Sequence, residues 1–266
     1  MHFIRAGLGT PPIFFVHGFA CSHEDWKPQL DSFSKTNEVV ACDLRGHGLT
    51  PGQPFECSIE HFGGDVAALA ANLDLRKVVL VGHSMGCRVV LEAARLAPQP
   101  VAGIVLIDGS RQGSGDPDAA EAAARAAIDK AGYRAFAESL FRQMFFSPSA
   151  LAEAIVARAL RRPEAIGAAL WPRMARWDAA EGDAALRAVR CPLLAIQSTT
   201  RDPLTLKRAP LKPGESSPWL DIVRGNVPQA RIEVLAGLGH FPQLEAPAAV
   251  NRLIEAFVDR LLQASR

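Results

Sequence analysis

The sequence of residues 82–86, Gly-His-Ser-Met-Gly, fits the pattern of a serine nucleophile held in a sharp turn. An apolar run typical of a buried strand precedes it, and a helical pattern follows it. A serine in such a turn has a strained backbone, and the flanking glycines avoid the collisions that larger side chains would cause. The pattern indicates nucleophilic attack by Ser84, with the backbone N–H of Met85 at a helix N-terminus stabilising the negative charge that develops.

A serine hydroxyl is a weak nucleophile at neutral pH and needs an adjacent base, for which histidine has a suitable pKa. We favour His240 among the seven histidines, because residues 237–241 follow the last predicted strand and precede the terminal helix. His17 and His83 lie inside other motifs and are expected to hold loops by hydrogen bonds, and His47 to pin a turn. The remaining three are expected at the surface: His2, His23 and His61.

The base in turn needs a carboxylate that fixes its tautomer and stabilises the imidazolium ion. Asp202 follows the predicted strand 193–196 and gives the chain order Ser, Asp, His. Asp108 ends the preceding strand and is a competitor. We favour Asp202, since that chain order fits it without rearrangement, whereas Asp108 would otherwise cap or brace the helices that follow it.

A second glycine turn lies near the N-terminus, in residues 14–20 with the sequence Phe-Phe-Val-His-Gly-Phe-Ala. It ends a predicted buried strand and is expected to face the nucleophile turn. The backbone N–H of Phe19 would then be the second donor to the oxyanion, beside that of Met85.

The elements that must position these groups alternate along the chain. Short apolar runs predict strands buried on both faces, and longer amphipathic stretches predict helices between them. The strands are expected at 13–16, 39–42, 78–81, 104–107, 193–196 and 232–235, and the helices at about 59–73, 85–96 and 246–262. This alternation predicts an α/β fold, a mostly parallel doubly wound sheet with helices on both faces.

The alternation stops after Asp108, and only helical patterns follow until the strand at 193–196. We therefore expect a core domain at residues 1–109 and 186–266, with a helical cap at 110–185 inserted after the sixth strand of the fold.

Within the cap, an alanine-rich helix is expected to start at Asp116 or Asp118 and to stop at Gly132. A second is expected to end at Pro163, and Pro172 to break or kink a third.

The cap also holds a large supply of apolar and aromatic side chains. Some of them must line a pocket beneath the cap, which favours a substrate with an apolar acyl or alcohol group. Docking the cap onto the core is the simpler interpretation for any one of these side chains. Those expected to bind substrate are Tyr133, Phe136, Phe141, Met144 and Trp171 of the cap and Phe241 beside His240. Acidic and basic residues nearly balance in the cap, so its arginines do not predict an anionic substrate.

Composition narrows the class of partner. The chain has 266 residues, 48% of them hydrophobic, and a formal net charge of +1. This composition favours a small-molecule substrate and does not determine the oligomeric state. Nothing indicates nucleic acid or a membrane as a partner, and the N-terminus lacks a signal-peptide pattern, so we expect a cytoplasmic protein.

The five cysteines are scattered without paired spacing, which argues for buried reduced thiols rather than a disulfide framework or a zinc site.

Together these motifs resemble the α/β-hydrolase fold superfamily, particularly its capped serine esterase and C–C hydrolase branches. The matching residues are 17–18, 43–48, 82–86 and 239–240, spread over nearly the whole chain. The resemblance implies acyl transfer through a covalent acyl-enzyme on Ser84, followed by attack of a water molecule with general-base help from His240. It implies no metal and no organic cofactor.

Two features depart from that superfamily. Its members usually begin with a longer β-hairpin, whereas only residues 2–5 precede the first glycine turn here, so the first sheet edge is expected to be truncated or the start site misread. The glycine usually found ahead of the acid appears as Thr199, and the stretch 204–219 is unusually long. We interpret that stretch as a solvated connection, although it could border the pocket entrance.

Serine at position 84 argues against haloalkane dehalogenases and epoxide hydrolases, which use aspartate there. Hydrolysis of a carboxylic ester is therefore the first hypothesis. The alternatives are hydrolysis of a C–C bond in a ring-cleavage product, for which the sequence has no distinctive acid clamp, and a hydrolase-like ligand receptor with slow turnover.

Overall fold

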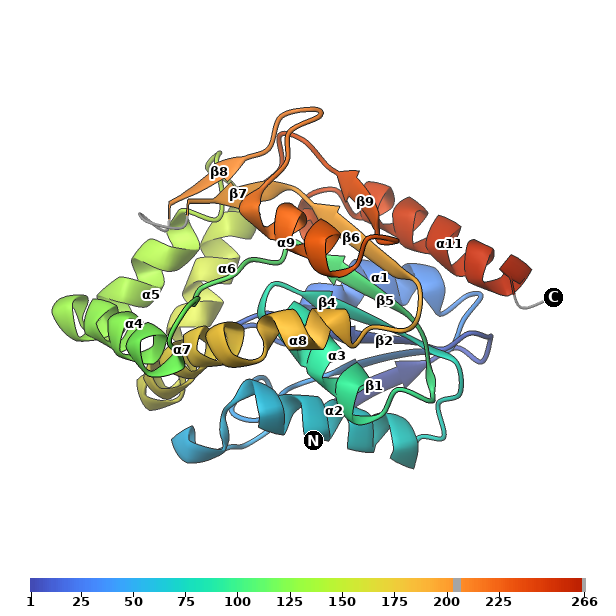
Figure 1. Ribbon diagram of the computed structural model, residues 1–266, viewed down its shortest axis with the longest axis horizontal. Coiled ribbons are helices and arrows are strands. Elements are labelled where there is room, and N and C mark those ends of the chain that lie inside the picture. The colour runs from blue at the N-terminus through green and yellow to red at the C-terminus, as the bar shows by residue number, and fades with distance from the viewer. Residues whose placement is uncertain (203–206, 265–266) are drawn as a thin grey trace.

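A seven-stranded sheet forms the centre of the molecule (Figure 1), in a computed structural model that describes residues 1–202 and 207–264. The strand order is β1-β3-β2-β4-β5-β6-β9. Strand β1 runs antiparallel to β3 at one edge, and every other neighbouring pair is parallel. The strands are β1 Phe3–Ala6, β2 Ile13–Val16, β3 Val39–Cys42, β4 Val78–His83, β5 Val101–Ile107, β6 Leu193–Gln197 and β9 Arg231–Val234. The predicted mostly parallel α/β fold is confirmed.

Helices cover both faces of the sheet, and strand β2 shows how its side chains are shared between them. Ile13 and Phe15 belong to the apolar cluster under helices α1 (Lys27–Phe33) and α11 (Pro247–Ala264). Phe14 and Val16 point to the opposite face, which is covered by α2 (Ile59–Asn72) and α3 (Met85–Leu96). Alternation along a strand sends successive side chains to opposite faces, so a strand between two helical layers must be apolar throughout.

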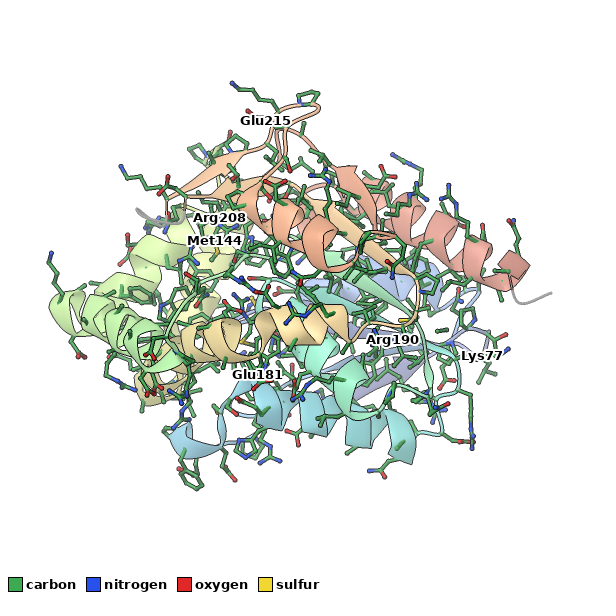
Figure 2. All side chains as sticks on the ribbon, viewed as in Figure 1. Lys77, Met144, Glu181, Arg190, Arg208 and Glu215 are labelled. Atoms are coloured by element: carbon green, nitrogen blue, oxygen red, sulfur yellow. The ribbon has the colours of Figure 1, made fainter. Side chains whose placement is uncertain are left out.

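Five helices follow β5 before the chain returns to the sheet at β6: α4 Pro117–Ala131, α5 Tyr133–Arg142, α6 Ala150–Leu160, α7 Glu164–Ala180 and α8 Gly182–Arg187. We call residues 117–187 the helical insertion. It follows the fifth strand of this chain and not the sixth, because a single strand, β1, forms the sheet edge where the superfamily that the sequence resembles usually has a longer β-hairpin. With the side chains drawn, Met144 of the insertion lies near Arg208 from the chain after β6 (Figure 2), and both line one cavity.

The ends of the inserted helices follow their capping residues. The Asp116 side chain accepts a hydrogen bond from the backbone N–H of Ala119 at the start of α4, and Gly132, with a positive φ of 76°, ends the helix. Helix α7 continues through Pro172, so of the two predicted outcomes, a break or a kink, the break does not occur. A proline removes one backbone donor, and packing of nine buried residues of α7 holds the helix together across it.

The chain after β6 is more regular than the sequence indicated. Strands β7 (Thr199–Arg201) and β8 (Arg208–Pro210) form a small antiparallel hairpin, and α9 (Pro218–Asn226) follows it. The predicted solvated connection therefore contains a strand and the start of a helix, although its residues 204–206 lie outside the described part of the chain. The shorter elements are the 3-10 helices η1 His23–Trp26 and η2 Pro54–Glu56 and the helix α10 Pro242–Glu245. None of the described helices is both long and apolar enough for a bilayer crossing.

A buried ion pair joins the insertion to the core. The guanidinium of Arg88, on α3, donates to both carboxylate oxygens of Asp178, on α7, at 2.8 and 2.7 Å. The two side chains are 2% and 4% exposed. Arg88 also donates to the Ser110 carbonyl at 2.6 Å, and Asp178 accepts from the backbone N–H of Gln112 at 2.6 Å. The pair therefore holds two segments in place against the core: the chain that leaves the sheet after β5, and the end of α7.

Removing one member of this pair is expected to destabilise the protein strongly, because the other charge stays buried without compensation. Arg88→Met should lower the free energy of unfolding by about 3–5 kcal/mol, measured by urea denaturation. Lys27→Met provides the control, since Lys27 and Asp31 form an exposed pair on α1 whose loss should cost about 0.5 kcal/mol or less. Equal stability of the two variants would contradict the clamping role of Arg88.

Candidate active site

Ser84 lies in the turn between β4 and α3 with φ 55° and ψ −112°. Residues other than glycine rarely adopt this backbone conformation. The turn is tight on both sides. A Cβ at position 82 would lie 2.3 Å from the carbonyl oxygen of Gly86, and one at position 86 would lie 2.2 Å from that of Val16. Glycine is therefore required at both positions, and the strained turn points Ser84 out of the sheet at the carboxyl end of β4.

A chain of two hydrogen bonds connects Ser84 to a buried acid. Ser84 Oγ lies 2.8 Å from His240 Nε2, and His240 Nδ1 lies 2.5 Å from Asp108 Oδ2. His240 is 1% exposed, and Asp108 has no exposed surface. A carboxylate only accepts hydrogen bonds, so Nδ1 carries the proton and Nε2 is left to accept the proton of the serine hydroxyl.

The charge of Asp108 is compensated from several segments. Oδ1 accepts hydrogen bonds from the backbone N–H groups of Ser198 and Thr199, both at 2.8 Å, and Oδ2 accepts one from the Thr199 hydroxyl at 2.5 Å. The guanidinium of Arg208 lies 3.3 Å from Oδ2. Burial alone would raise the pKa of Asp108, but the hydrogen bond and charge of His240, the charge of Arg208 and the Thr199 hydroxyl hold that pKa at about 2.

The preference for Asp202 as the acid is wrong, because the structure puts Asp108 and not Asp202 beside His240. Asp202 is exposed and follows β7, where its backbone N–H donates to the carbonyl of Lys207 across the hairpin. The turn into β7 carries position 202 away from the sheet edge. Thr199, where the superfamily usually has glycine, begins that hairpin and donates to Asp108.

His240 is neutral in the folded protein. Burial, followed by the charge of Arg208, lowers its pKa, and the hydrogen bond to Asp108 only partly opposes this shift. Its carbonyl accepts a hydrogen bond from His83 Nε2 at 2.7 Å, and its backbone N–H donates to the carbonyl of Met144 at 2.8 Å. The imidazole is thus held in place and in the form that a general base needs.

The glycine turn near the N-terminus lies against Ser84, as expected. A Cβ at Gly18 would lie 3.2 Å from the Cβ of Ser84, and Phe19 and Met85 line the same cavity as the serine. Met85 is the first residue of α3, where backbone N–H groups have no partner within the helix. His17 secures the turn: its Nδ1 donates to the Gly18 carbonyl at 2.7 Å and its Nε2 accepts from the Leu44 N–H at 3.1 Å.

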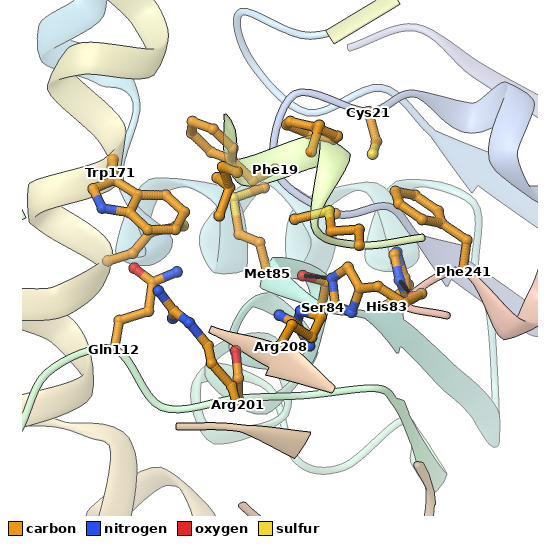
Figure 3. A pocket seen from close by; sticks show the side chains of 17 residues that line it. Phe19, Cys21, His83, Ser84, Met85, Gln112, Trp171, Arg201, Arg208 and Phe241 are labelled. Carbon is orange, nitrogen blue, oxygen red and sulfur yellow. Dashed lines mark hydrogen bonds between the residues drawn. The ribbon is translucent and has the colours of Figure 1, made fainter. Parts of the chain in front are cut away.

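Four of the six side chains expected to bind substrate line the cavity at Ser84 (Figure 3). They are Phe141, Met144, Trp171 and Phe241. The other two do not. Tyr133 packs its ring between α5 and α7, with its hydroxyl against Gly167, and Phe136 lies behind Trp171, with ring centroids 5.0 Å apart. Both contribute to the packing of the insertion, and neither lines this cavity.

The cavity also has a polar wall that was not predicted from the sequence. Ser110 and Gln112 come from the segment that leaves β5, and Arg201 and Arg208 come from the β7–β8 hairpin. Leu140, Met174, Cys21 and His83 complete the lining that was not expected. Nothing in the sequence of the 204–219 stretch indicated that Arg208 folds inward.

The residues that could hold a metal lie apart from Ser84. Among the described residues, one group of three suitable side chains was found: His2, His23 and Asp43. Both imidazoles contact the Asp43 carboxylate, at 3.1 and 2.9 Å, and that carboxylate also accepts from the backbone N–H groups of His23 and Leu49. These hydrogen bonds brace the turn after β3, so His2 and His23 are partly buried and not simple surface residues. All five cysteines are free, and burial raises the pKa of Cys21 in the cavity wall.

Comparison with known proteins gives one family match over most of the chain. The sequence model described as the alpha/beta hydrolase family matches residues 13–253. A thermophilic esterase from Thermogutta terrifontis, solved with malate bound, has a similar structure with a TM-score of 0.78 and 27% sequence identity. The similarity covers 98% of this chain and 93% of that one.

The curated relatives match over shorter segments. The dihydrolipoyllysine-residue acetyltransferase component of the acetoin cleaving system of Pseudomonas putida is 37% identical over 105 residues, 40% of this chain and 28% of that protein. A bifunctional esterase/perhydrolase of Acinetobacter calcoaceticus is 41% identical over 100 residues, 37% of this chain and 36% of that protein. The chain thus matches about a third of the length of these relatives.

The buried histidines make stability depend on pH. Burial is the first cause that lowers the pKa of His17, His47, His83 and His240, with that of His47 at about 4. Unfolding restores a pKa near 6.5, so the unfolded chain binds more protons as the pH falls below that value, and stability falls with it. Each histidine that stays neutral in the folded protein should lower the free energy of unfolding by on the order of 2 kcal/mol at pH 5 relative to pH 7.

We expect a lower free energy of unfolding in urea at pH 5 than at pH 7, and a weaker pH dependence in His47→Gln. An unchanged urea midpoint between pH 7 and pH 5 would contradict this account.

Proposed function

Because this chain belongs to the alpha/beta hydrolase family, we propose that it is a serine hydrolase that cleaves a carboxylic ester through an acyl-enzyme on Ser84. The observation that carries the proposal is the unbroken pair of hydrogen bonds from Ser84 Oγ through His240 to Asp108, at 2.8 and 2.5 Å. A nucleophile, a base and an acid that orients the base are the groups that acyl transfer to a serine requires.

In the first half of the reaction, Ser84 Oγ attacks the ester carbonyl while its proton passes to His240 Nε2. The imidazolium ion that forms is stabilised by the Asp108 carboxylate, which stays ionised because its pKa is about 2. The carbonyl oxygen becomes negative and accepts hydrogen bonds from the backbone N–H groups of Phe19 and Met85. Collapse of this intermediate breaks the ester C–O bond, and His240 returns the proton to the departing alcohol.

In the second half, a water molecule takes the place of the alcohol. His240 Nε2 accepts a proton from the water, whose oxygen attacks the acyl carbon. The second tetrahedral intermediate collapses, Ser84 Oγ regains a proton from His240, and the carboxylic acid leaves. The strained backbone of Ser84 serves both halves, because it keeps Oγ at one position without reorganisation.

Two of the similar proteins are esterases, which supports an ester substrate for this chain. The solved structure from Thermogutta terrifontis is an esterase, and the relative from Acinetobacter calcoaceticus is a bifunctional esterase/perhydrolase. The apolar part of the cavity lining, which includes Phe141, Met144 and Trp171, suits the hydrocarbon part of such a substrate.

The proposal predicts a burst of p-nitrophenol when the protein is mixed with p-nitrophenyl esters of increasing acyl chain length. The burst amplitude should match the concentration of active sites, since one acyl-enzyme forms on each Ser84 before water attacks. Ser84→Ala should abolish the burst and lower kcat by at least about three orders of magnitude. Retention of most activity by this variant would refute the role of Ser84, and tight stoichiometric binding without turnover would indicate a ligand receptor instead.

A matched pair of variants tests the acid. Asp108→Asn should lower kcat on the order of 10³–10⁴-fold, because the amide no longer enforces the tautomer of His240 or stabilises its charge. Asp202→Asn, in the exposed hairpin, should stay within about twofold of wild type. Steady-state kinetics on one p-nitrophenyl ester distinguish them. A larger loss in the Asp202 variant would reverse the assignment made from the geometry.

A further inference from the structure

The segment that carries His240 lies outside regular secondary structure. Residues 235–241 connect β9 to α10, so their shape depends on the groups to which their backbone is hydrogen-bonded. The base can take the proton of Ser84 only while Nε2 stays within hydrogen-bond distance of Oγ, which is 2.8 Å away. A misplacement of about 1 Å between reacting groups can cost on the order of 100-fold in rate. The backbone contacts of this segment therefore affect the reaction through the position of the imidazole.

Glu245, the last residue of α10, binds this segment on both sides of His240. Its Oε2 accepts a hydrogen bond from the backbone N–H of Gly239 at 2.9 Å, and its Oε1 accepts one from the backbone N–H of Phe241 at 3.1 Å. The backbone N–H of Glu245 in turn donates to the Phe241 carbonyl at 2.9 Å. One carboxylate thus holds the residue before the base and the residue after it.

Gly239 allows the carboxylate to come this close. A Cβ at this position would lie 2.7 and 2.9 Å from the two carboxylate oxygens of Glu245 and 2.5 Å from the carbonyl oxygen of Met144. A larger residue would have to displace the carboxylate or the chain between α5 and α6. The glycine before His240 is therefore required by close packing, because its φ is not positive.

Other backbone groups of the segment have uncharged partners. The His240 carbonyl accepts a hydrogen bond from His83, whose pKa is lowered by burial. The Gly239 carbonyl accepts one from the Ser198 hydroxyl at 2.7 Å. Hydrogen bonds to an ionised acceptor are stronger than those between neutral groups, and Glu245 supplies two. Burial raises the pKa of Glu245, and the two N–H donors oppose this shift because they stabilise the charged carboxylate.

We propose that Glu245 is a positioning residue for the catalytic base, which fixes the backbone on either side of His240 so that Nε2 stays at Ser84. This inference rests on the proposed function and adds a residue to it. Asp108 orients the imidazole ring through Nδ1, and Glu245 orients the segment from which the ring extends. Without the carboxylate, two buried backbone N–H groups would lose their acceptors, and the segment would shift to satisfy them.

Glu245→Gln tests this role with little change in side-chain volume. An amide has one acceptor oxygen, and its NH2 group would face one of the two N–H donors, so both hydrogen bonds cannot be kept. On a p-nitrophenyl ester, kcat should fall about 10- to 100-fold while KM stays within about twofold, because the walls of the cavity are unchanged. Glu245→Ala removes both acceptors and should lower kcat at least as far. Glu255→Gln, at an exposed position of α11, is the control and should keep the wild-type kcat.

The NMR signals of the histidine ring nitrogens supply a readout that needs no turnover. In wild type, the shifts of His240 should report one tautomer, with the proton on Nδ1. In Glu245→Gln they should move toward the tautomer mixture of a solvated imidazole, because the ring leaves Asp108 and Ser84. The control Glu255→Gln should retain the wild-type shifts.

A purely structural role for Glu245 predicts a different result. The free energy of unfolding in urea would fall, but kcat of the folded protein and the ring-nitrogen shifts of His240 would stay at their wild-type values, and this outcome would overturn the proposal. If wild type turns over no ester, the hydrolysis proposal fails and the ring-nitrogen shifts decide alone. A change in Glu245→Gln that is absent from Glu255→Gln supports the positioning role, and identical spectra refute it.

Discussion

Burying a carboxylate costs free energy unless donors surround it, and Asp108 has no exposed surface. Its donors come from segments far apart in the chain: Ser198 and Thr199 after β6, Arg208 on β8 and His240 after β9. Each of these segments is positioned in part by the need to compensate one charge. The same arrangement brings the imidazole to Ser84, so the groups that stabilise the acid also align the nucleophile and its base.

Local patterns were enough to predict the elements with strong periodicity and the turns they lead into. The runs 13–16 and 39–42 coincide with β2 and β3, and the glycines around Ser84 marked a turn that only small residues permit. The acid was harder, because neighbouring parallel strands end at the same edge and each ends near an aspartate. The choice between Asp108 and Asp202 depends on the β7–β8 hairpin, which turns position 202 outward, and its three-residue strands are too short for a periodicity signal.

The residues that line the cavity were also hard to predict from the sequence. An amphipathic pattern identifies the apolar face of a helix, but it does not say whether that face meets a pocket or another helix. Tyr133 and Trp171 have similar sequence signals, yet the first packs against Gly167 and the second lines the cavity. The inward direction of Arg201 and Arg208 depends on contacts with α7 and with Asp108, which exist only after the insertion and the hairpin have packed together.

The ion pair between Arg88 and Asp178 determines which helices of the insertion could be exchanged with those of another protein in a chimaera. Asp178 binds Arg88 of the core and also the backbone of Gln112, at the point where the chain leaves the sheet. A chimaera that exchanges only α4–α6 would leave this junction intact. An exchange that extends through α7 would separate the two charges, and the donor segment would need to bring an acid to the same place or be accompanied by a neutral residue at position 88.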